Sequence, residues 1–63
     1  MPIIKVEMLK GRTVEQKRAI ARELTQGFVR ACGAKPESIW IVLDEVDKEN
    51  WAAGGELLSD KSG

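Results

Sequence analysis

The sequence contains no histidine and only one cysteine, Cys32. Without histidine, neither a Ser-His-Asp nor a Cys-His nucleophile system can form. A single cysteine excludes a disulfide within the chain, and one thiol among scattered carboxylates makes a poor zinc site, so we expect no metal. Any acid–base chemistry must therefore use carboxylates, lysines, the thiol or a chain terminus.

Long hydrophobic runs are also missing. The longest apolar run, Ile39 to Leu43, is far too short to cross a membrane, which takes about 20 residues. No signal-peptide pattern is visible at the start of the chain. Together with the free cysteine, these absences favour the cytoplasm and argue against a membrane partner.

Neither sign of charge is in excess, because ten basic residues balance ten acidic ones. A nucleic-acid-binding protein would show a basic excess, so we expect no nucleic-acid partner. The charges are nevertheless divided: residues 1–32 hold seven basic and three acidic groups, a sum of +4, and residues 33–63 hold three and seven, a sum of −4. This division indicates either two solvated faces or a local cationic site hidden by the balanced total.

The chain is short, with 63 residues, which predicts one domain over residues 1–63. A chain of this size buries only about 60% of the surface that its unfolded form exposes. Such small folds usually need disulfides, a metal or a partner chain. Since the first two are excluded, we expect association with other chains.

A strand is predicted from Ile3 to Leu9, where apolar and charged residues alternate with a period of two. Pro2 lies at its start, where the missing N–H interrupts no internal hydrogen bond of a sheet. The segment from Lys10 to Arg12 is a short connection to the next element.

A helix of about 18 residues follows this connection. Thr13 is a good N-cap, and Gln16 completes a capping-box pattern. Gly33 is a natural terminating residue, and Pro36 prevents continuation. Apolar residues recur at helical spacing along one face, at Ile20, Leu24, Phe28 and Ala31.

A second strand is predicted from Ser38 to Val46, with a centre that is apolar on both faces. From Asp47 to Gly55 we expect a loop that ends in a sharp turn of two glycines. Glu56 to Ser59 is compatible with a short strand or a turn, and Asp60 to Gly63 with a frayed tail.

Strand, helix and strand form a βαβ unit of the α/β (α+β) class, with parallel strands and a right-handed crossover. Two strands and one helix cannot close a core, so an edge and an apolar face stay uncovered. The sequence therefore predicts an obligate oligomer that extends the sheet across chains.

The start of the chain, Met1-Pro2, offers one unusual base. Initiator methionine is commonly removed before proline, which leaves Pro2 with a free secondary amine. An α-amino group titrates near ~7.7–8.0, close enough to neutrality for a general base. The alternative is that Met-Pro reflects only processing, as in many chains.

Three segments resemble the 4-oxalocrotonate tautomerase family. They are Pro2-Ile3-Ile4-Lys5-Val6 in the first strand, the segment from Leu9 to Lys17 with its Gly11-Arg12 pair, and Asn50-Trp51-Ala52-Ala53-Gly54-Gly55-Glu56. The resemblance covers essentially the whole chain. It is specific in the combination of motifs, whereas none of them is specific alone.

This resemblance implies an enol–keto tautomerase of the βαβ fold that assembles as a homohexamer, or as a related trimer or heterohexamer. Pro2 would act as general base and then general acid, and Arg12 would bind a substrate carboxylate and draw electron density. Leu9 and Trp51 would line the pocket. The implied partners are small dienols and unsaturated 2-oxo acids of aromatic catabolism, with no cofactor.

One position departs from the family pattern. The member that acts on dicarboxylates has a second arginine in its second strand, at the position of Trp40 here. The departure favours a monocarboxylate or a larger, more apolar enol, with Trp40 as a substrate-binding surface. The alternative is that Trp40 packs in a core or an interface.

Two further functions stay open. A non-catalytic oligomeric module would result if Met1 were retained, because the Pro2 nitrogen would then be an amide. Hydratase or dehalogenase activity ranks lower, since the carboxylate that such relatives use near Ala52-Ala53 is missing. Cys32 is expected to be inert, and the acidic residues Asp44, Glu45, Asp47 and Glu49 to form a solvated rim.

Overall fold

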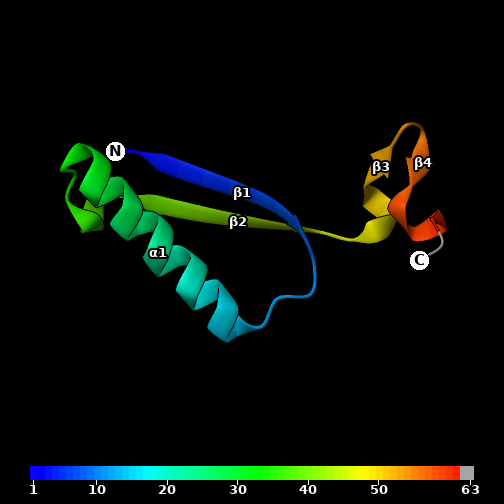
Figure 1. The fold of residues 1–63 in the computed structure, drawn as a ribbon, viewed down its shortest axis with the longest axis horizontal. Helices are drawn as coiled ribbons and strands as arrows, with labels where there is room; N and C mark the ends of the chain where they lie inside the picture. The colour runs from blue at the N-terminus through cyan, green and yellow to red at the C-terminus, as the bar shows by residue number, and fades with distance from the viewer. Residues whose placement is uncertain (62–63) are drawn as a thin grey trace.

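A βαβ unit followed by a small hairpin makes up the computed structural model, which describes residues 1–61 (Figure 1). The helix and strands are β1 (Ile3–Leu9), α1 (Val14–Cys32), β2 (Trp40–Val46), β3 (Ala52–Ala53) and β4 (Glu56–Leu57). Single 3-10 turns lie at Pro36–Ser38, Lys48–Asn50 and Leu58–Asp60.

Strands β1 and β2 pair in parallel, as predicted, with Ile3 opposite Trp40 and Leu9 opposite Val46. Their side chains alternate between a half-buried face and an exposed face. On the half-buried face, Met8 lies opposite Glu45 and is the best-buried apolar residue. The alternation follows directly from the period of two in the sequence.

Helix α1 begins and ends where its capping residues predict. The Thr13 hydroxyl accepts the N–H of Gln16 at 3.1 Å, and the Thr13 N–H donates to the Gln16 side chain at 2.9 Å. Gly33 closes the helix with φ of 72°, and its N–H donates to the Val29 carbonyl. Of the predicted apolar face, Ile20, Leu24 and Phe28 are half-buried, whereas Ala31 is exposed.

The predicted start of the second strand is wrong by two residues. Pro36–Ser38 forms a 3-10 turn, in which the Ser38 hydroxyl donates to the Lys35 carbonyl at 2.7 Å. Proline favours such a first-turn position because its fixed φ suits a helical turn. β2 therefore begins at Trp40.

The C-terminal segment is more ordered than its sequence suggests. The expected loop contains β3, which pairs antiparallel with β4 across Gly54-Gly55. These glycines have φ of 61° and 85°, as a two-residue hairpin turn with both central residues at positive φ requires, so the predicted sharp turn is confirmed. Asp60 belongs to a 3-10 turn rather than to a frayed tail, and residues 62–63 of that predicted tail lie outside the described residues.

One chain has almost no core of its own. Among residues 1–61, Met8 is the only buried apolar residue, with 8% of its surface exposed. The radius of gyration is 15.0 Å, whereas a compact chain of this length would have about 11 Å. Figure 1 shows why: the hairpin projects beyond the end of the sheet, away from α1. Within the described residues, no helix is both long and apolar enough to cross a membrane.

Candidate active site

Pro2 is held at the start of β1 by the neighbouring strand. Its carbonyl accepts the backbone N–H of Trp40 at 2.9 Å, and its side chain is half-buried. Met1, which precedes it, is 82% exposed. An exposed methionine is accessible to an aminopeptidase, and its removal would leave the Pro2 carbonyl anchored as before.

Arg12 lies in the connection that follows β1, and its Nη1 donates to the Leu9 carbonyl at 3.0 Å. Within residues 1–61, it makes no ion pair with a carboxylate. Five other basic side chains do pair with carboxylates, namely Lys5, Lys10, Lys17, Arg18 and Arg22. The remaining N–H groups of Arg12 are therefore free to bind an anion bidentately.

Trp51 lies between the 3-10 turn at Lys48–Asn50 and strand β3 of the hairpin. Its N–H donates to the Lys48 carbonyl at 3.4 Å, and its carbonyl accepts the N–H of Leu58 at 2.8 Å. The side chain is half-buried. The sequence offered no signal for these backbone contacts, because they depend on the hairpin that β3 and β4 form.

The five site residues predicted from the sequence divide into two groups within one chain. Pro2 and Trp40 lie at the amino ends of the parallel strands, whereas Leu9, Arg12 and Trp51 lie at or beyond their carboxyl ends. Seven residues of strand separate the groups by about 23 Å, at roughly 3.3 Å per residue. One chain alone therefore does not bring Pro2 and Arg12 to the same small substrate.

No ready-made pocket or metal site offers an alternative location. Residues 1–61 of a single chain enclose no pocket, and no three metal-ligating side chains gather among them. The thiol of Cys32 is exposed. A small-molecule site must therefore form between chains or on an open surface.

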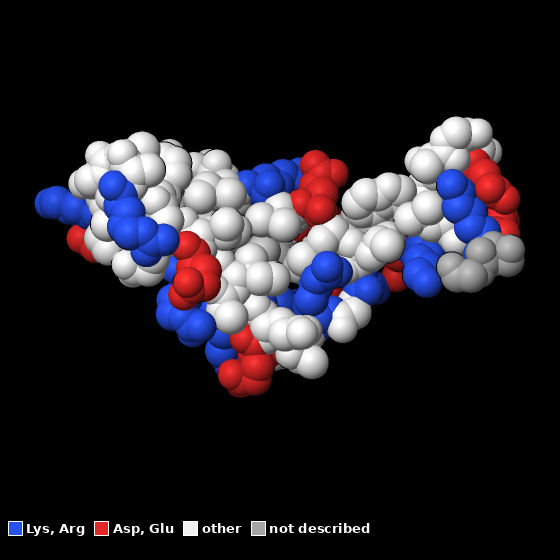
Figure 2. Space-filling view, viewed as in Figure 1, with Lys and Arg blue, Asp and Glu red and all other residues white. Residues whose placement is uncertain are grey.

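The basic and acidic halves of the chain contact each other through three ion pairs. Three lysines of the basic half pair with three carboxylates at the end of β2 or just beyond it, namely Lys5 with Asp44, Lys17 with Glu45 and Lys10 with Asp47. Asp44 and Asp47 keep 48% and 44% of their side chains exposed, as in a solvated rim, whereas Glu45 is only 23% exposed. Figure 2 shows basic and acidic side chains interspersed on the face in view, without one dominant patch.

The model of the protein family described as "Tautomerase enzyme" matches residues 2–61. The 2-hydroxymuconate tautomerase of Bacillus subtilis is 40% identical over 60 residues, which cover 95% of this chain and 97% of that protein. The match begins at Pro2 and includes every residue of the two groups described above.

Solved structures of similar proteins share the fold. A crystal structure of a 4-oxalocrotonate tautomerase homologue has a TM-score of 0.91 and 44% identity, with both chains covered completely. The heterohexameric 4-oxalocrotonate tautomerase of Chloroflexus aurantiacus has a TM-score of 0.87 and 28% identity, over 95% of this chain and 97% of that one.

Proposed function

The chain belongs to the tautomerase family, and from this premise we propose that it converts small 2-hydroxydienoates or unsaturated 2-oxo acids between their enol and keto forms. The enzyme is an isomerase of the tautomerase type. The observation that carries the proposed substrate class is Arg12, a guanidinium with free donors and no carboxylate partner within the described residues.

Pro2 is the proposed general base and acid. After removal of Met1, its secondary amine takes the proton of the enol hydroxyl, so that the O–H bond breaks and the carbonyl forms. The protonated amine then delivers a proton to a carbon of the conjugated system, which forms the new C–H bond. The ring fixes the direction of the nitrogen lone pair, and the 2.9 Å contact from Trp40 holds the residue in place.

Arg12 is the proposed anchor for the substrate carboxylate. A guanidinium stays charged at every working pH and pairs with a carboxylate through two parallel hydrogen bonds. The same charge stabilises the electron density that moves toward the carboxylate end when the proton leaves. Leu9 and Trp51, at the same end of the sheet, supply the apolar wall that keeps water from the reacting amine.

The working site is proposed to form between chains of a homohexamer. The opposite placement of Pro2 and Arg12, together with the lack of a core and of a pocket within residues 1–61, supports a site completed by a neighbour. Strands of a second chain running antiparallel would bring its Arg12 end to the Pro2 end of the first. The heterohexameric relative supports an assembly of six. A stable monomer at micromolar concentration in sedimentation experiments would contradict the proposal.

Trp40 is the proposed determinant of substrate shape. It is 57% exposed, and its backbone contacts Pro2 directly. An indole at this position offers stacking area but no charge for a second carboxylate. We therefore expect a preference for monocarboxylated enols with an apolar remainder.

The wider setting follows from the same proposal. Residues 1–63 act as one tautomerase-like domain in the cytoplasm, in aromatic catabolism, and the reaction uses no cofactor. A placed base and an electrostatic anchor are sufficient for enol–keto transfer.

Intact mass followed by kinetics tests this function. We expect a mass that lacks Met1, and ketonisation of phenylenolpyruvate or 2-hydroxymuconate that falls about 100-fold or more in Pro2→Ala, since general acid–base catalysis contributes roughly 10²–10⁴-fold. Retained Met1 with no activity would favour the non-catalytic module. Equal rates of the two proteins would exclude the Pro2 mechanism. Conversion of unsaturated acids to a product that has gained the elements of water would favour a hydratase.

A further inference from the structure

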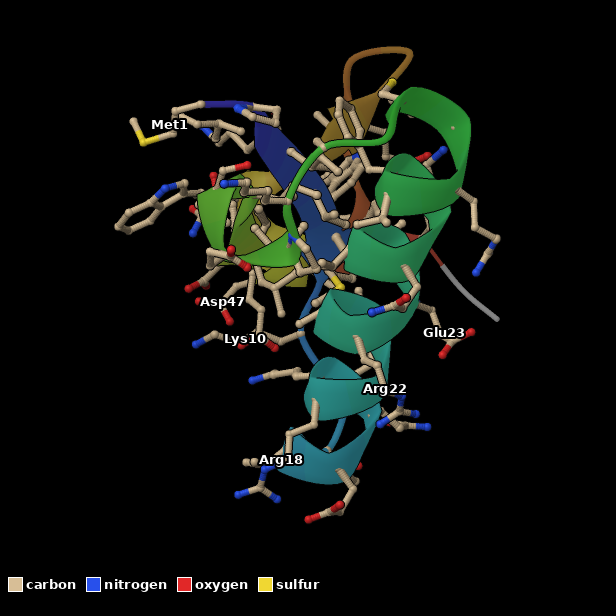
Figure 3. All side chains as sticks on the ribbon, turned by 90° about the vertical axis from the view of Figure 1, so that its left-hand side faces the viewer. Met1, Lys10, Arg18, Arg22, Glu23 and Asp47 are labelled. Carbon is tan, nitrogen blue, oxygen red and sulfur yellow. The ribbon has the colours of Figure 1, made fainter. Side chains whose placement is uncertain are left out.

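The loop that carries Arg12 is attached to the end of β2 on its amino-terminal side. The backbone N–H of Lys10 donates to the Val46 carbonyl at 3.0 Å, and its Nζ lies 3.2 Å from Asp47 Oδ1. Figure 3 shows the Lys10 and Asp47 side chains beside each other, apart from the labelled side chains of Arg22 and Glu23 on α1. Both the main chain and the side chain of Lys10 therefore bind consecutive residues of the β2 end.

A second attachment follows the loop. The Lys17 ammonium pairs with Glu45 at 2.5 Å, and both side chains are largely shielded, with 29% and 23% of their surfaces exposed. The capping box at Thr13 fixes the first turn of α1. Arg12 thus sits between two ion pairs that connect its flanks to Glu45 and Asp47, two residues apart on one strand end.

Asp47 also starts the turn that leads to the aromatic wall. Its carbonyl accepts the N–H of Asn50 at 2.9 Å, and the next carbonyl, that of Lys48, accepts the N–H of Trp51. The carboxylate of Asp47 therefore reaches back to the Arg12 loop while its backbone organises the approach to Trp51. No other described ion pair connects these two segments of the proposed site.

We propose that Lys10 and Asp47 are a positioning pair for substrate binding, which holds the Arg12 loop against the segment that carries Trp51. The inference deepens the proposed function and rests on it. Neither side chain touches the substrate; the pair acts by fixing where the Arg12 guanidinium points when a carboxylate arrives. Small misplacement of a binding group is costly because the gain from pre-oriented partners is lost.

The exposure of the pair makes this role separable from a role in stability. Lys10 and Asp47 are 62% and 44% exposed, and exposed ion pairs contribute little to folding. Arg22 and Glu23 form a control pair in the middle of α1, at 3.3 Å with 63% and 70% exposed, outside the Arg12 loop. Loss of either pair should change the stability of the assembly equally little. A fall in kcat/KM on loss of the Lys10–Asp47 pair alone would therefore report on the placement of Arg12.

The experiment compares Asp47→Asn, Lys10→Gln and the control Glu23→Gln in the full-length protein, with the monocarboxylated enol phenylenolpyruvate as the probe. We expect kcat/KM to fall about threefold to tenfold in the first two, mainly through KM, with oligomeric mass and Tm unchanged. Glu23→Gln should match the wild type. The exchanged double variant Lys10→Asp with Asp47→Lys should return kcat/KM to within about twofold of the wild type.

The same substitution in a protein that lacks the Arg12 guanidinium tests whether the ion pair acts through Arg12. If the pair acts through Arg12, Asp47→Asn causes no further loss of kcat/KM in a protein that already carries Arg12→Ala. Equal fractional losses in both backgrounds, or a loss that the exchanged pair does not repair, would overturn the proposal. The two failures are distinguishable. A wild-type protein that does not ketonise the probe refutes the proposed function. A large effect of Arg12→Ala with none from Asp47→Asn refutes only the positioning pair.

Discussion

The backbone N–H of Trp40 donates to the carbonyl of Pro2 at 2.9 Å, so the first residue of β2 is tied to the residue proposed as the catalytic base. The bond continues the parallel register, in which Ile3 lies opposite Trp40. It fixes the position of Pro2 through its carbonyl, while the ring nitrogen becomes a free secondary amine once Met1 leaves. Trp40, the proposed determinant of substrate preference, therefore lies directly beside Pro2, the proposed base.

Replacement of Trp40 by arginine tests that connection. Trp40→Arg adds a cation next to Pro2 and removes the stacking surface, so we expect the ratio of kcat/KM for 2-hydroxymuconate over phenylenolpyruvate to rise about tenfold, the gain of one charge-assisted hydrogen bond. Trp40→Phe keeps an aromatic surface and should leave the ratio nearly unchanged. No gain on the dicarboxylate would indicate that Trp40 packs in an interface instead.

Removal of the Arg12 guanidinium should weaken substrate binding more than it slows proton transfer. A hydrogen-bonded charge pair contributes about 1.5–3 kcal/mol, so Arg12→Ala should lower kcat/KM roughly 10- to 150-fold, largely through KM. Arg12→Lys restores the charge without the bidentate geometry and should recover only part of the loss. Steady-state kinetics on a monocarboxylated enol measure both, and a KM equal to that of the wild type in Arg12→Ala would remove Arg12 from the site.

The pH profile tests the identity of the base. The amine of Pro2 abstracts a proton only when it is itself unprotonated, so kcat/KM should rise with pH and reach a plateau above the pKa of the amine. For a free α-amino group this inflection lies at or below pH ~8. A profile that is flat from pH 5 to 9 would exclude an α-amino base.

Local sequence rules account for most of the βαβ unit. Alternation of apolar residues predicts β1, and Thr13, Gln16 and Gly33 mark both ends of α1, because capping hydrogen bonds involve only near neighbours. The short strand at Ala52–Ala53 escaped prediction because alanine has little preference for strands and the pairing depends on the glycine turn.

The candidate site was predictable only in part, because some of its contacts depend on how distant segments pair in the fold. Pro2 stands out as a possible base from the start of the chain, whereas Arg12 and Trp51 are proposed from the resemblance to the 4-oxalocrotonate tautomerase family. The pair of Lys10 with Asp47 joins residues far apart in the sequence and depends on the register that places Leu9 opposite Val46. The opposite charges of the two halves were the available signal, but they did not say which lysine meets which carboxylate.

The length of β1 has a consequence for mixtures of defective chains. Because Pro2 and Arg12 lie at opposite ends of its seven residues, a shared site would take one from each of two neighbours. Chains that carry Pro2→Ala and chains that carry Arg12→Ala would each have strongly reduced activity alone. Refolded together in equal amounts, they should regain activity at about a quarter of the sites, if subunits mix at random in closed oligomers. The activity of a site would then depend on both chains that form it, so two variants with different defects would restore activity to each other.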